Sequence, residues 1–278
     1  MTGLPGLGPI TSVTISTPDL QSSEAAYVEH LGYRVESRGT ISPDLAQRMQ
    51  CPSVAGARYS VVLPAAGDGF TFRFIEQPAT ARYKAFSCFG WNAAELIVRD
   101  VDEMAARLAT SPFEALGPPQ DLSFTDAIRA MQLRGPAGEI LYLTQFKRAL
   151  DVLPAPPARC DVDRVFIVIV GGPSLDALVE FYCSNFSLPA PQRMESRVKA
   201  MSAVFGLSPE HRYSIAALPL HGACYIEADE MPQAATAPTS ATGRLPPGIA
   251  VVSFSSPSVA TPRFLTGAAG EILELVPA

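Results

Sequence analysis

Runs of basic residues are absent from this sequence, and acidic residues outnumber basic ones. The 278 residues include 21 Lys and Arg against 27 Asp and Glu, which gives a formal net charge of −6. A surface with this balance repels the phosphate backbone of DNA and RNA. We therefore expect no nucleic-acid partner.

Long hydrophobic runs are also absent. Although 47% of the residues are hydrophobic, no stretch approaches the roughly 20 apolar residues that a membrane-spanning helix needs. Residues Met1 to Pro9 contain neither a positively charged segment nor a continuous apolar stretch, so they do not resemble a signal peptide. We expect a cytoplasmic protein with no membrane partner.

Cysteine and histidine are scarce and scattered. The five cysteines are odd in number, lie far apart and include no C-x-x-C motif, which disfavours a disulfide framework and a zinc ribbon. Buried single thiols are the expected state. The three histidines, His30, His211 and His221, have no metal-ligand spacing and are typical of loop or solvated positions.

An internal repeat is the most informative feature of the chain. Residues Gly135 to Leu143 and Gly267 to Leu275 are identical at seven of nine positions, and Arg58-Tyr-Ser-Val is echoed by Arg212-Tyr-Ser-Ile. The second copy is about twenty residues shorter in its later part. The apolar spacing that predicts a helix over 101–108 has no counterpart there. We therefore expect the second copy to lack one helix.

The repeat predicts two modules of similar element order. Residues 1–148 form the first module, 149–160 a proline-containing linker and 161–278 the second module; the loop at 232–247 is long enough to be a lid. The expected strands are 10–16, 58–63, 71–76, 93–98, 127–133 and 139–145, then 162–170, 213–218, 223–227, 249–254 and 271–276. The expected helices are 20–31, 101–108 and 175–182.

This arrangement resembles the vicinal-oxygen-chelate superfamily, which includes glyoxalase I, extradiol dioxygenases and bleomycin-resistance proteins. The resemblance rests on Ile10 to Leu20, on Leu31-Gly-Tyr, on Ile97 to Asp102 and on the two Gly-Glu-Ile-Leu strands. It implies an α+β fold of two tandem βαβββ-type modules whose curled mixed sheets enclose a cavity. The fold alone does not specify the chemistry.

The alternation of side chains along a strand predicts which residues line the cavity. Ser12 and Thr14 with Ser16, Arg164 and Phe166 with Val168, Tyr142, and Glu274 are expected to face inward. The resemblance implies metal ligands on the first, middle and last strands. Those positions hold Ser12 and Arg164, Ala93 and Gly248, and Tyr142 and Glu274. Only Glu274 is a metal-type ligand, with Glu95 as a substitute, so we expect no metal and no other cofactor.

The remaining polar residues suggest acid–base chemistry. Tyr142 and Glu274 are candidates to move protons, and Arg164 to hold a negatively charged oxygen. A purely structural Arg164–Glu274 ion pair and an inert Tyr142 are equally compatible with the sequence. Glu95 either contacts the ligand or pairs with Arg73 or Arg129. Trp91, with the phenylalanines around it, forms either an aromatic wall for a flat ligand or plain core.

Three functions follow from these residues. The first is a metal-independent lyase or isomerase that acts on a small oxygenated, possibly aromatic, compound. The second is a metal-free binding or resistance protein that sequesters a small molecule without changing it. The third is a divergent dioxygenase or glyoxalase with a metal at Glu274 and Glu95. A small molecule is the expected partner in each case, and pairing into a homodimer is compatible with all three.

Overall fold

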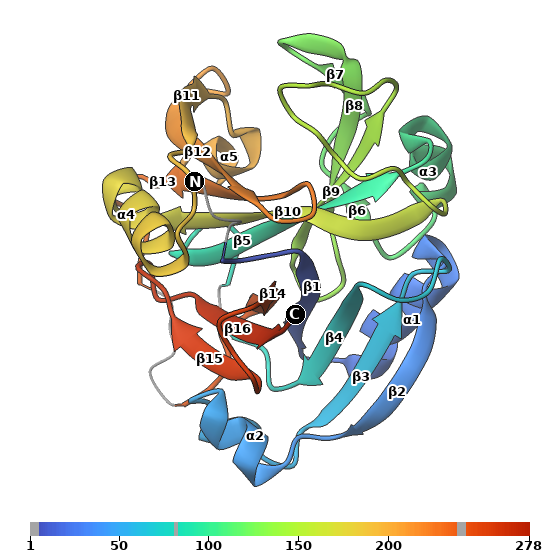
Figure 1. Cartoon of the computed structure of the whole chain (residues 1–278). Helices are drawn as coiled ribbons and strands as arrows, with labels where there is room; N and C mark the ends of the chain where they lie inside the picture. Colours follow the sequence, from blue (N-terminus) through green and yellow to red (C-terminus); the bar gives the residue numbers. More distant parts are fainter. Residues whose placement is uncertain (1–5, 81–82, 238–242) are drawn as a thin grey trace.

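The computed structural model describes residues 6–80, 83–237 and 243–278. Two mixed β-sheets and a few helices make up these residues (Figure 1). The seven-stranded sheet has the order β15-β16-β14-β1-β4-β3-β2, and the nine-stranded sheet has the order β11-β12-β13-β10-β5-β9-β8-β6, with β7 paired to β8. The expected α+β class is confirmed.

The seven-stranded sheet joins the two ends of the chain. It contains β1 (Ile10–Thr17), β2 (Arg34–Thr40), β3 (Arg58–Leu63), β4 (Thr71–Glu76), β14 (Gly248–Ser256), β15 (Arg263–Thr266) and β16 (Ile272–Pro277). Its central contact is the antiparallel pair β1–β14. The first third of the chain therefore shares a sheet with the last.

The nine-stranded sheet is built from the middle of the chain. It contains β5 (Gly90–Val98), β6 (Glu114–Ala115), β7 (Gln120–Leu122), β8 (Thr125–Arg134), β9 (Ile140–Phe146), β10 (Val162–Gly172), β11 (Gln192–Ser196), β12 (Tyr213–Leu220) and β13 (Cys224–Glu230). Its central contact is the antiparallel pair β10–β5. Each of the two sequence repeats consequently contributes strands to both sheets, rather than curling a sheet of its own.

The helices start and end where the sequence provides caps. In α1 (Leu20–Leu31) the Asp19 side chain accepts a hydrogen bond from the Ser22 backbone N–H, and the left-handed Gly32 ends the helix. The other helices are α2 (Pro43–Arg48), the 3-10 turn η1 (Pro52–Val54), α3 (Val101–Leu108), α4 (Leu175–Phe186) and α5 (Lys199–Phe205). Residues 257–262, between β14 and β15, contain no helix, which confirms that the second copy lacks a counterpart of α3.

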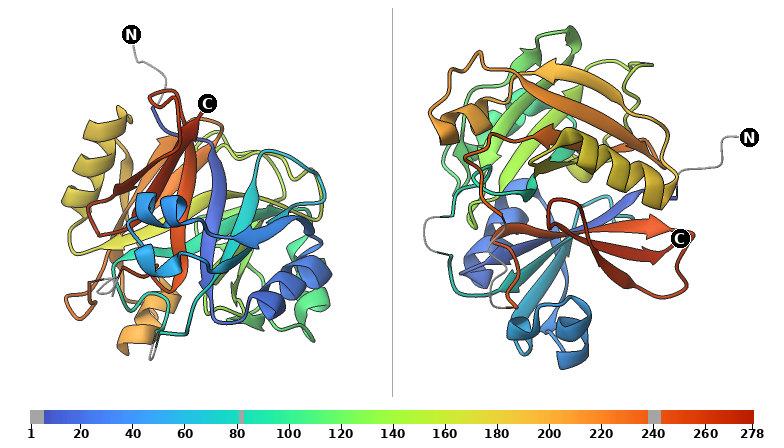
Figure 2. Two further views of the ribbon diagram at one scale, coloured as in Figure 1. Left: turned by 90° about the horizontal axis from the view of Figure 1, so that it is seen from below. Right: turned by 90° about the vertical axis from the view of Figure 1, so that its left-hand side faces the viewer.

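A continuous apolar core occupies the space between the two sheets. Side chains such as Val13, Phe72, Leu96, Val168 and Leu273 are completely or almost completely buried in it. Helices α1 and α3 lie together at one side of the molecule, and α4 lies at the other (Figures 1 and 2). Each sheet therefore has a second face, directed away from the shared core, which the longer helices do not cover.

Helices α1 and α4 each carry one buried tyrosine that is hydrogen-bonded to a turn of the sheet against which the helix does not pack. Helix α1 packs against β3 and β4, yet its Tyr27 hydroxyl donates a hydrogen bond to Glu139 before β9, with 2.8 Å between the oxygens. Helix α4 packs against β12 and β13, and its Tyr182 hydroxyl donates to Glu271 before β16 at 2.7 Å. These repeat-related bonds connect the two sheets.

None of the described helices is long and apolar enough to span a membrane. All five cysteines are free thiols; Cys51 and Cys224 are buried, as expected, whereas Cys88, Cys160 and Cys183 are partly exposed. Residues 147–161 and the described parts of 232–247 contain no helix or strand. The centre of the loop that we predicted at 232–247 lies outside the described residues.

Candidate active site

The register of the nine-stranded sheet places three carboxyl groups and a phenol on one face. On adjacent strands, Glu95 of β5 is paired with Tyr142 of β9 and with Ile167 of β10. On the next strand, β13, Glu227 lies opposite Ile169 and Asp229 opposite Gly171 of β10. Because residues paired in register point to the same side, these groups share a face. We call Glu95, Glu227 and Asp229 the acidic trio.

The members of the acidic trio differ in their contacts. Glu95 accepts a hydrogen bond from the Thr144 hydroxyl, with 2.6 Å between the oxygens. Asp229 is completely buried, and neither of its carboxylate oxygens has a hydrogen-bond partner in residues 6–80, 83–237 and 243–278. Glu227 and Glu95 are partly exposed. Within the trio, Asp229 is shielded from solvent, whereas solvent reaches Glu95 and Glu227.

Burial dominates the electrostatics of this face. It raises the pKa of Glu95 to about 7, against the lowering effect of the Thr144 hydrogen bond, and it raises the pKa of Asp229 to about 7. Burial, and then the charges of Asp229 and Glu95, hold the pKa of Glu227 well above its usual value. Among the residues that the structure describes, no cation contributes to these shifts. At neutral pH the trio can therefore both donate and accept protons.

Tyr142 is a hydrogen-bond donor in this setting. Burial, followed by the charges of Glu227, Asp229 and Glu95, keeps the pKa of its phenol well above the usual value. The phenol consequently stays protonated when the carboxyl groups titrate.

Apolar residues surround the acidic trio. Ile167 and Ile169 of β10, Ile140 of β9 and Ile215 of β12 share its face by register and are nearly completely buried. The exposed Met194 of β11 lies opposite Ile215. This face combines acidic groups with apolar walls, as small-molecule sites do.

A short helix covers part of this face. Met201 and Ser202 of α5 are buried, and the Ser202 hydroxyl lies 2.9 Å from the hydroxyl of Tyr213 on β12. In Figure 1, α5 stands beside β11 and β12, and β7 and β8 rise at the opposite end of the sheet. The strands between them carry the acidic trio.

The corresponding face of the seven-stranded sheet is filled with apolar side chains. Residues of α2 and its flanks pack onto it in a separate hydrophobic cluster: Ile41, Ala46, Met49, Cys51, Val54, Ile75, Leu245, Ala250, Val251, Phe264 and Ile272. Ser12 and Thr14 lie on this face, and Ser12 accepts a hydrogen bond from the Thr71 hydroxyl at 3.0 Å. The geometry there is that of a covered core with a few polar groups.

The partner of Glu274 differs from the one that the sequence suggested. Glu274 is nearly buried on the seven-stranded sheet, where it accepts a hydrogen bond from Ser253 at 2.6 Å and lies 3.4 Å from an Arg73 nitrogen. Arg164 belongs to β10 of the other sheet and lies 4.0 Å from Asp163. The predicted Arg164–Glu274 ion pair is therefore wrong, because the two residues lie in different sheets.

Irregularities in β10 changed the predicted faces of that strand. Its pairing with β5 shifts register between Val162 and Val165 and again before Ile167, which indicates bulges. Val168 pairs with Ala94 and faces the core between the sheets, and Phe166 is buried against Phe146, with 5.7 Å between the ring centroids. The prediction that Val168 faces the site is wrong.

Glu95 and Trp91 occupy different surroundings. Glu95 has no partner among the arginines that the structure describes: Arg129 pairs with Asp102 and Asp121, and Arg73 with Glu274. Trp91 is nearly buried, and its indole N–H donates to the backbone oxygen of Ile272 at 2.8 Å. That bond joins the two sheets and favours the core role for Trp91.

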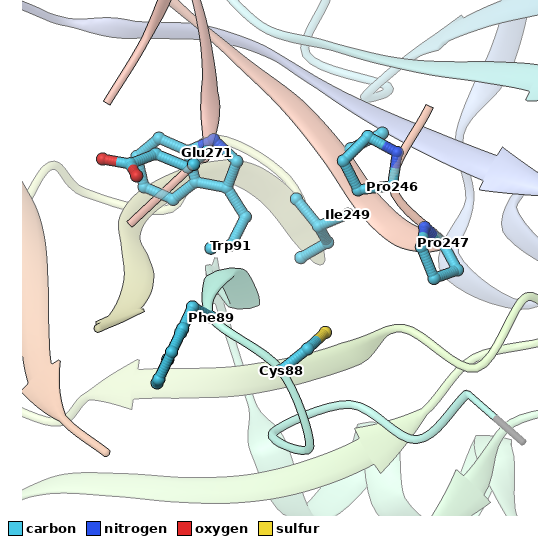
Figure 3. A pocket seen from close by; sticks show the side chains of 10 residues that line it. Cys88, Phe89, Trp91, Pro246, Pro247, Ile249 and Glu271 are labelled. Carbon is cyan, nitrogen blue, oxygen red and sulfur yellow. The ribbon is translucent and has the colours of Figure 1, made fainter. Parts of the chain in front are cut away.

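A shallow hollow lies beside Trp91 (Figure 3). Pro246, Pro247 and Ile249 line one part of it, and Cys88 and Phe89 line another. Its volume of about 10 Å³ is close to that of a single water. It is too small to hold an organic substrate.

A divalent metal, which the resemblance implies, does not fit the residues of either face. The central strands of the nine-stranded sheet present Ala93, Ile167 and Ile169 beside the acidic trio. On the seven-stranded sheet, the positive charge of Arg73 beside Glu274 would repel a metal ion. In residues 6–80, 83–237 and 243–278, no group of three or more His, Cys, Asp or Glu lies close enough together to hold one.

The sequence alone pointed to Tyr142 and Glu95 of this site, but not to Glu227, Asp229 or Thr144. The alternation in Cys224-Tyr-Ile-Glu-Ala-Asp-Glu was a usable signal, because Glu227 and Asp229 share one side of a strand whose other side is apolar. Of the other predicted site residues, Ser12, Thr14 and Glu274 lie on the seven-stranded sheet.

Of the comparisons with known proteins, only the one with solved structures finds matches, and these concern the fold. No family model matches the sequence, and no curated protein sequence matches it. Solved structures with the glyoxalase and dioxygenase fold do match, over nearly the whole chain. The predicted glyoxalase-like fold is thereby confirmed.

Two of these structures show the extent of the likeness. Glyoxalase I from Zea mays gives a TM-score of 0.65 at 12% identity, and the match covers 96% of this chain and 92% of that one. A putative dioxygenase from Bacillus subtilis subsp. subtilis str. 168 gives 0.63 at 10% identity, with coverages of 99% and 86%. At such identities the likeness establishes the fold and leaves the chemistry to be argued from the site.

Proposed function

We propose that this protein is a small-molecule enzyme, a lyase or isomerase, that works by acid–base chemistry on the face of the nine-stranded sheet that carries the acidic trio. One observation carries the proposal. Glu95 and Asp229 share that face and each has a pKa of about 7. A general acid or base is most effective when its pKa lies near the working pH.

The roles follow from the contacts of each group. Because the Thr144 hydroxyl holds one oxygen of Glu95, the other oxygen is available to remove or return a substrate proton. Tyr142, which stays protonated, would donate a hydrogen bond to a substrate oxygen on which negative charge develops. We give Glu274 no role, because it is bonded to Ser253 and Arg73 on the other sheet.

The metal-independent character of the reaction is part of the proposal. It is supported by the apolar residues that the central strands present and by the absence of a positioned ligand set in the described part of the chain. The alternative of a divergent glyoxalase or dioxygenase predicts activity that depends on added metal. Turnover with and without a chelator, alongside elemental analysis of untagged protein, distinguishes the two.

The first test is a proton-exchange screen. Small oxygenated compounds would be incubated with the protein in deuterated water, and loss of carbon-bound protons would be followed by NMR. Glu95→Gln should lower the exchange rate of any compound found by about 10²-fold or more, because the base is removed. Glu274→Gln is the matched control and should leave the rate unchanged.

Two outcomes would contradict this function. Full activity of Glu95→Gln would remove the proposed base from the mechanism. Tight binding of a compound without exchange or conversion would support instead a protein that sequesters its ligand.

We further propose that the protein acts in the cytoplasm on a small molecule, without nucleic-acid or membrane partners. Its surface charge and the lack of a membrane-spanning helix in the described residues support this. A homodimer remains a prediction that light scattering on the purified protein would test.

A further inference from the structure

Gln132 of β8 is a polar neighbour of Tyr142 on the nine-stranded face. The register of β8 and β9 pairs Gln132 with Tyr142, and the register of β9 and β5 pairs Tyr142 with Glu95. These strands are adjacent in the order β5-β9-β8. Glu95, Tyr142 and Gln132 therefore form one row across three strands, with Tyr142 in the middle.

The fold does not use the two neutral polar groups of this row. Gln132 and Tyr142 are half-buried, and in the described part of the chain no residue forms a hydrogen bond with the Gln132 amide or the Tyr142 hydroxyl. The amide groups of Gln77 and Gln145, by contrast, are bonded within the fold. The row thus presents two polar side chains that remain available to a ligand.

The spacing within the row allows both groups to bind one oxygen atom. Residues directly opposite each other in an antiparallel pair have Cβ atoms about 4.5–5.5 Å apart. An oxygen between two donors at that separation can lie within about 2.7–3.2 Å of each, as a hydrogen bond requires. The Tyr142 phenol, whose pKa is raised by burial and the neighbouring acids, donates its O–H, and the Gln132 amide donates an N–H. Glu95 lies one strand spacing, about 4.8 Å, from Tyr142.

The surroundings of the row favour an uncharged substrate. The neighbouring rows contribute the apolar residues Ala93, Ala130 and Ile140. The one cation that the register of the described strands places beside the row, Arg134, is exposed and paired with Glu114. A carboxylate or phosphate on the substrate would lie near the acidic trio without a free cation to compensate it, which like-charge repulsion disfavours.

We propose that Gln132 determines the specificity of this site and that, together with Tyr142, it holds the oxygen of an uncharged carbonyl compound. The inference names the substrate class of the site in "Proposed function" and rests on that function. Glu95 removes a proton from the carbon next to the carbonyl group. The electron pair of the C–H bond forms a carbon–carbon double bond, and the oxygen takes up the negative charge. The O–H of Tyr142 and the N–H of Gln132 stabilise that charge, and Glu95 then returns the proton.

Two ketones with the same ring provide the test: cyclohexanone, which is uncharged, and 4-oxocyclohexanecarboxylate, which carries a carboxylate. Each is incubated with the protein in deuterated buffer near pH 7. Replacement of the protons next to the carbonyl group is followed by NMR and corrected for exchange in buffer alone. We expect the protein to accelerate exchange in cyclohexanone at least about tenfold more than in the carboxylate, because the acidic trio repels the second probe.

Substitutions of Gln132 test its role directly. Gln132→Met keeps the length of the side chain but cannot donate a hydrogen bond, so it should lower cyclohexanone exchange by about 10²-fold. Gln120→Met is the matched control and should leave the rate unchanged, because Gln120 lies on β7 opposite Ala130 and not opposite Tyr142. If Gln132→Met fails to fold, Gln132→Glu serves in its place; it has the same shape, lacks the N–H donor and should also lower the rate.

Equal acceleration of both ketones would overturn the proposal, as would a lack of acceleration with cyclohexanone. Loss of exchange in Glu95→Gln together with full activity of Gln132→Met would retain the proposed function and remove only this inference. A rate that falls in Gln132→Met but is unchanged in Glu95→Gln would do the reverse, because it would remove the proposed base and keep the role of Gln132.

Discussion

At the scale of single residues, the buried carboxyl groups of this protein differ in whether the fold supplies hydrogen-bond donors to them. Glu139 and Glu271 each accept one hydrogen bond from a tyrosine hydroxyl and one from a backbone N–H, so both carboxylate oxygens have a donor within the fold. Asp229 is equally buried, but no described residue donates a hydrogen bond to it. A buried carboxyl group thus serves as a structural tie in one place and belongs to the candidate site in another.

Removing one tyrosine hydroxyl should measurably destabilise the fold. Tyr27→Phe deletes the donor to Glu139 at 2.8 Å and leaves a buried oxygen without it, which costs about 1–3 kcal/mol. Tyr182→Phe, the repeat-related change, should cost a similar amount through Glu271. Urea unfolding monitored by circular dichroism gives both values, and an unchanged midpoint would show that the bonds contribute nothing.

At the scale of elements, the apolar periodicity predicted the longer helices and the inner strands correctly, but it did not predict strands at the edges of the sheets. The predicted helix over 101–108 and the strands over 58–63 and 71–76 have those bounds in the structure. The edge strands β2 and β11 and the short helices α2 and α5 were not predicted. The residues of β2 and β11 are largely exposed, and a mostly polar strand has no apolar period to detect.

The end of α1 offers a test of local conformation. Gly32 has a φ of 74°, and a Cβ placed there would meet nothing within 4 Å. Gly32→Ala should therefore cost about 1 kcal/mol through backbone strain alone. Gly117 is equally open but does not have a positive φ, so Gly117→Ala is the control and should not lower the thermal midpoint. A similar loss in both variants would rule out the conformational explanation.

At the scale of the whole molecule, several carboxyl groups have raised pKa values and make stability depend on pH. The pKa of Glu95, of Glu139 and of Asp229 is about 7 in the folded protein because of burial, against ordinary values of 4.5 or 3.8. At pH values between the ordinary pKa and about 7, these carboxyl groups are ionised in the unfolded chain but still protonated in the folded protein. Stability contributed by these groups is therefore present at low pH and lost as the pH rises to about 7.

The expected result is a protein that unfolds at a higher temperature near pH 5 than near pH 8. Thermal unfolding across this range measures the effect. Glu139→Gln, which cannot ionise, should flatten the curve by removing one of the groups. A midpoint that rises steadily from pH 5 to pH 8 would contradict the raised pKa values of the buried acids.

The sequence by itself determined the class of fold, the order of the main elements, the loss of one helix in the second copy and the positions of Tyr142 and Glu95 on one face. These properties are encoded locally, because alternation and helical spacing depend on neighbouring residues. The repeat extended them from one half of the chain to the other.

Only the tertiary structure decided which halves share a sheet and which acids meet. The pairs β1–β14 and β10–β5 join segments distant in sequence, and an alternating strand specifies its faces without specifying its partner. The bulges in β10 moved Val168 to the core side, and the pairing of β10 with β13 placed Glu227 and Asp229 on the face of Glu95. Local patterns carry no information about such long-range pairing, so the acidic trio became visible only in the folded chain.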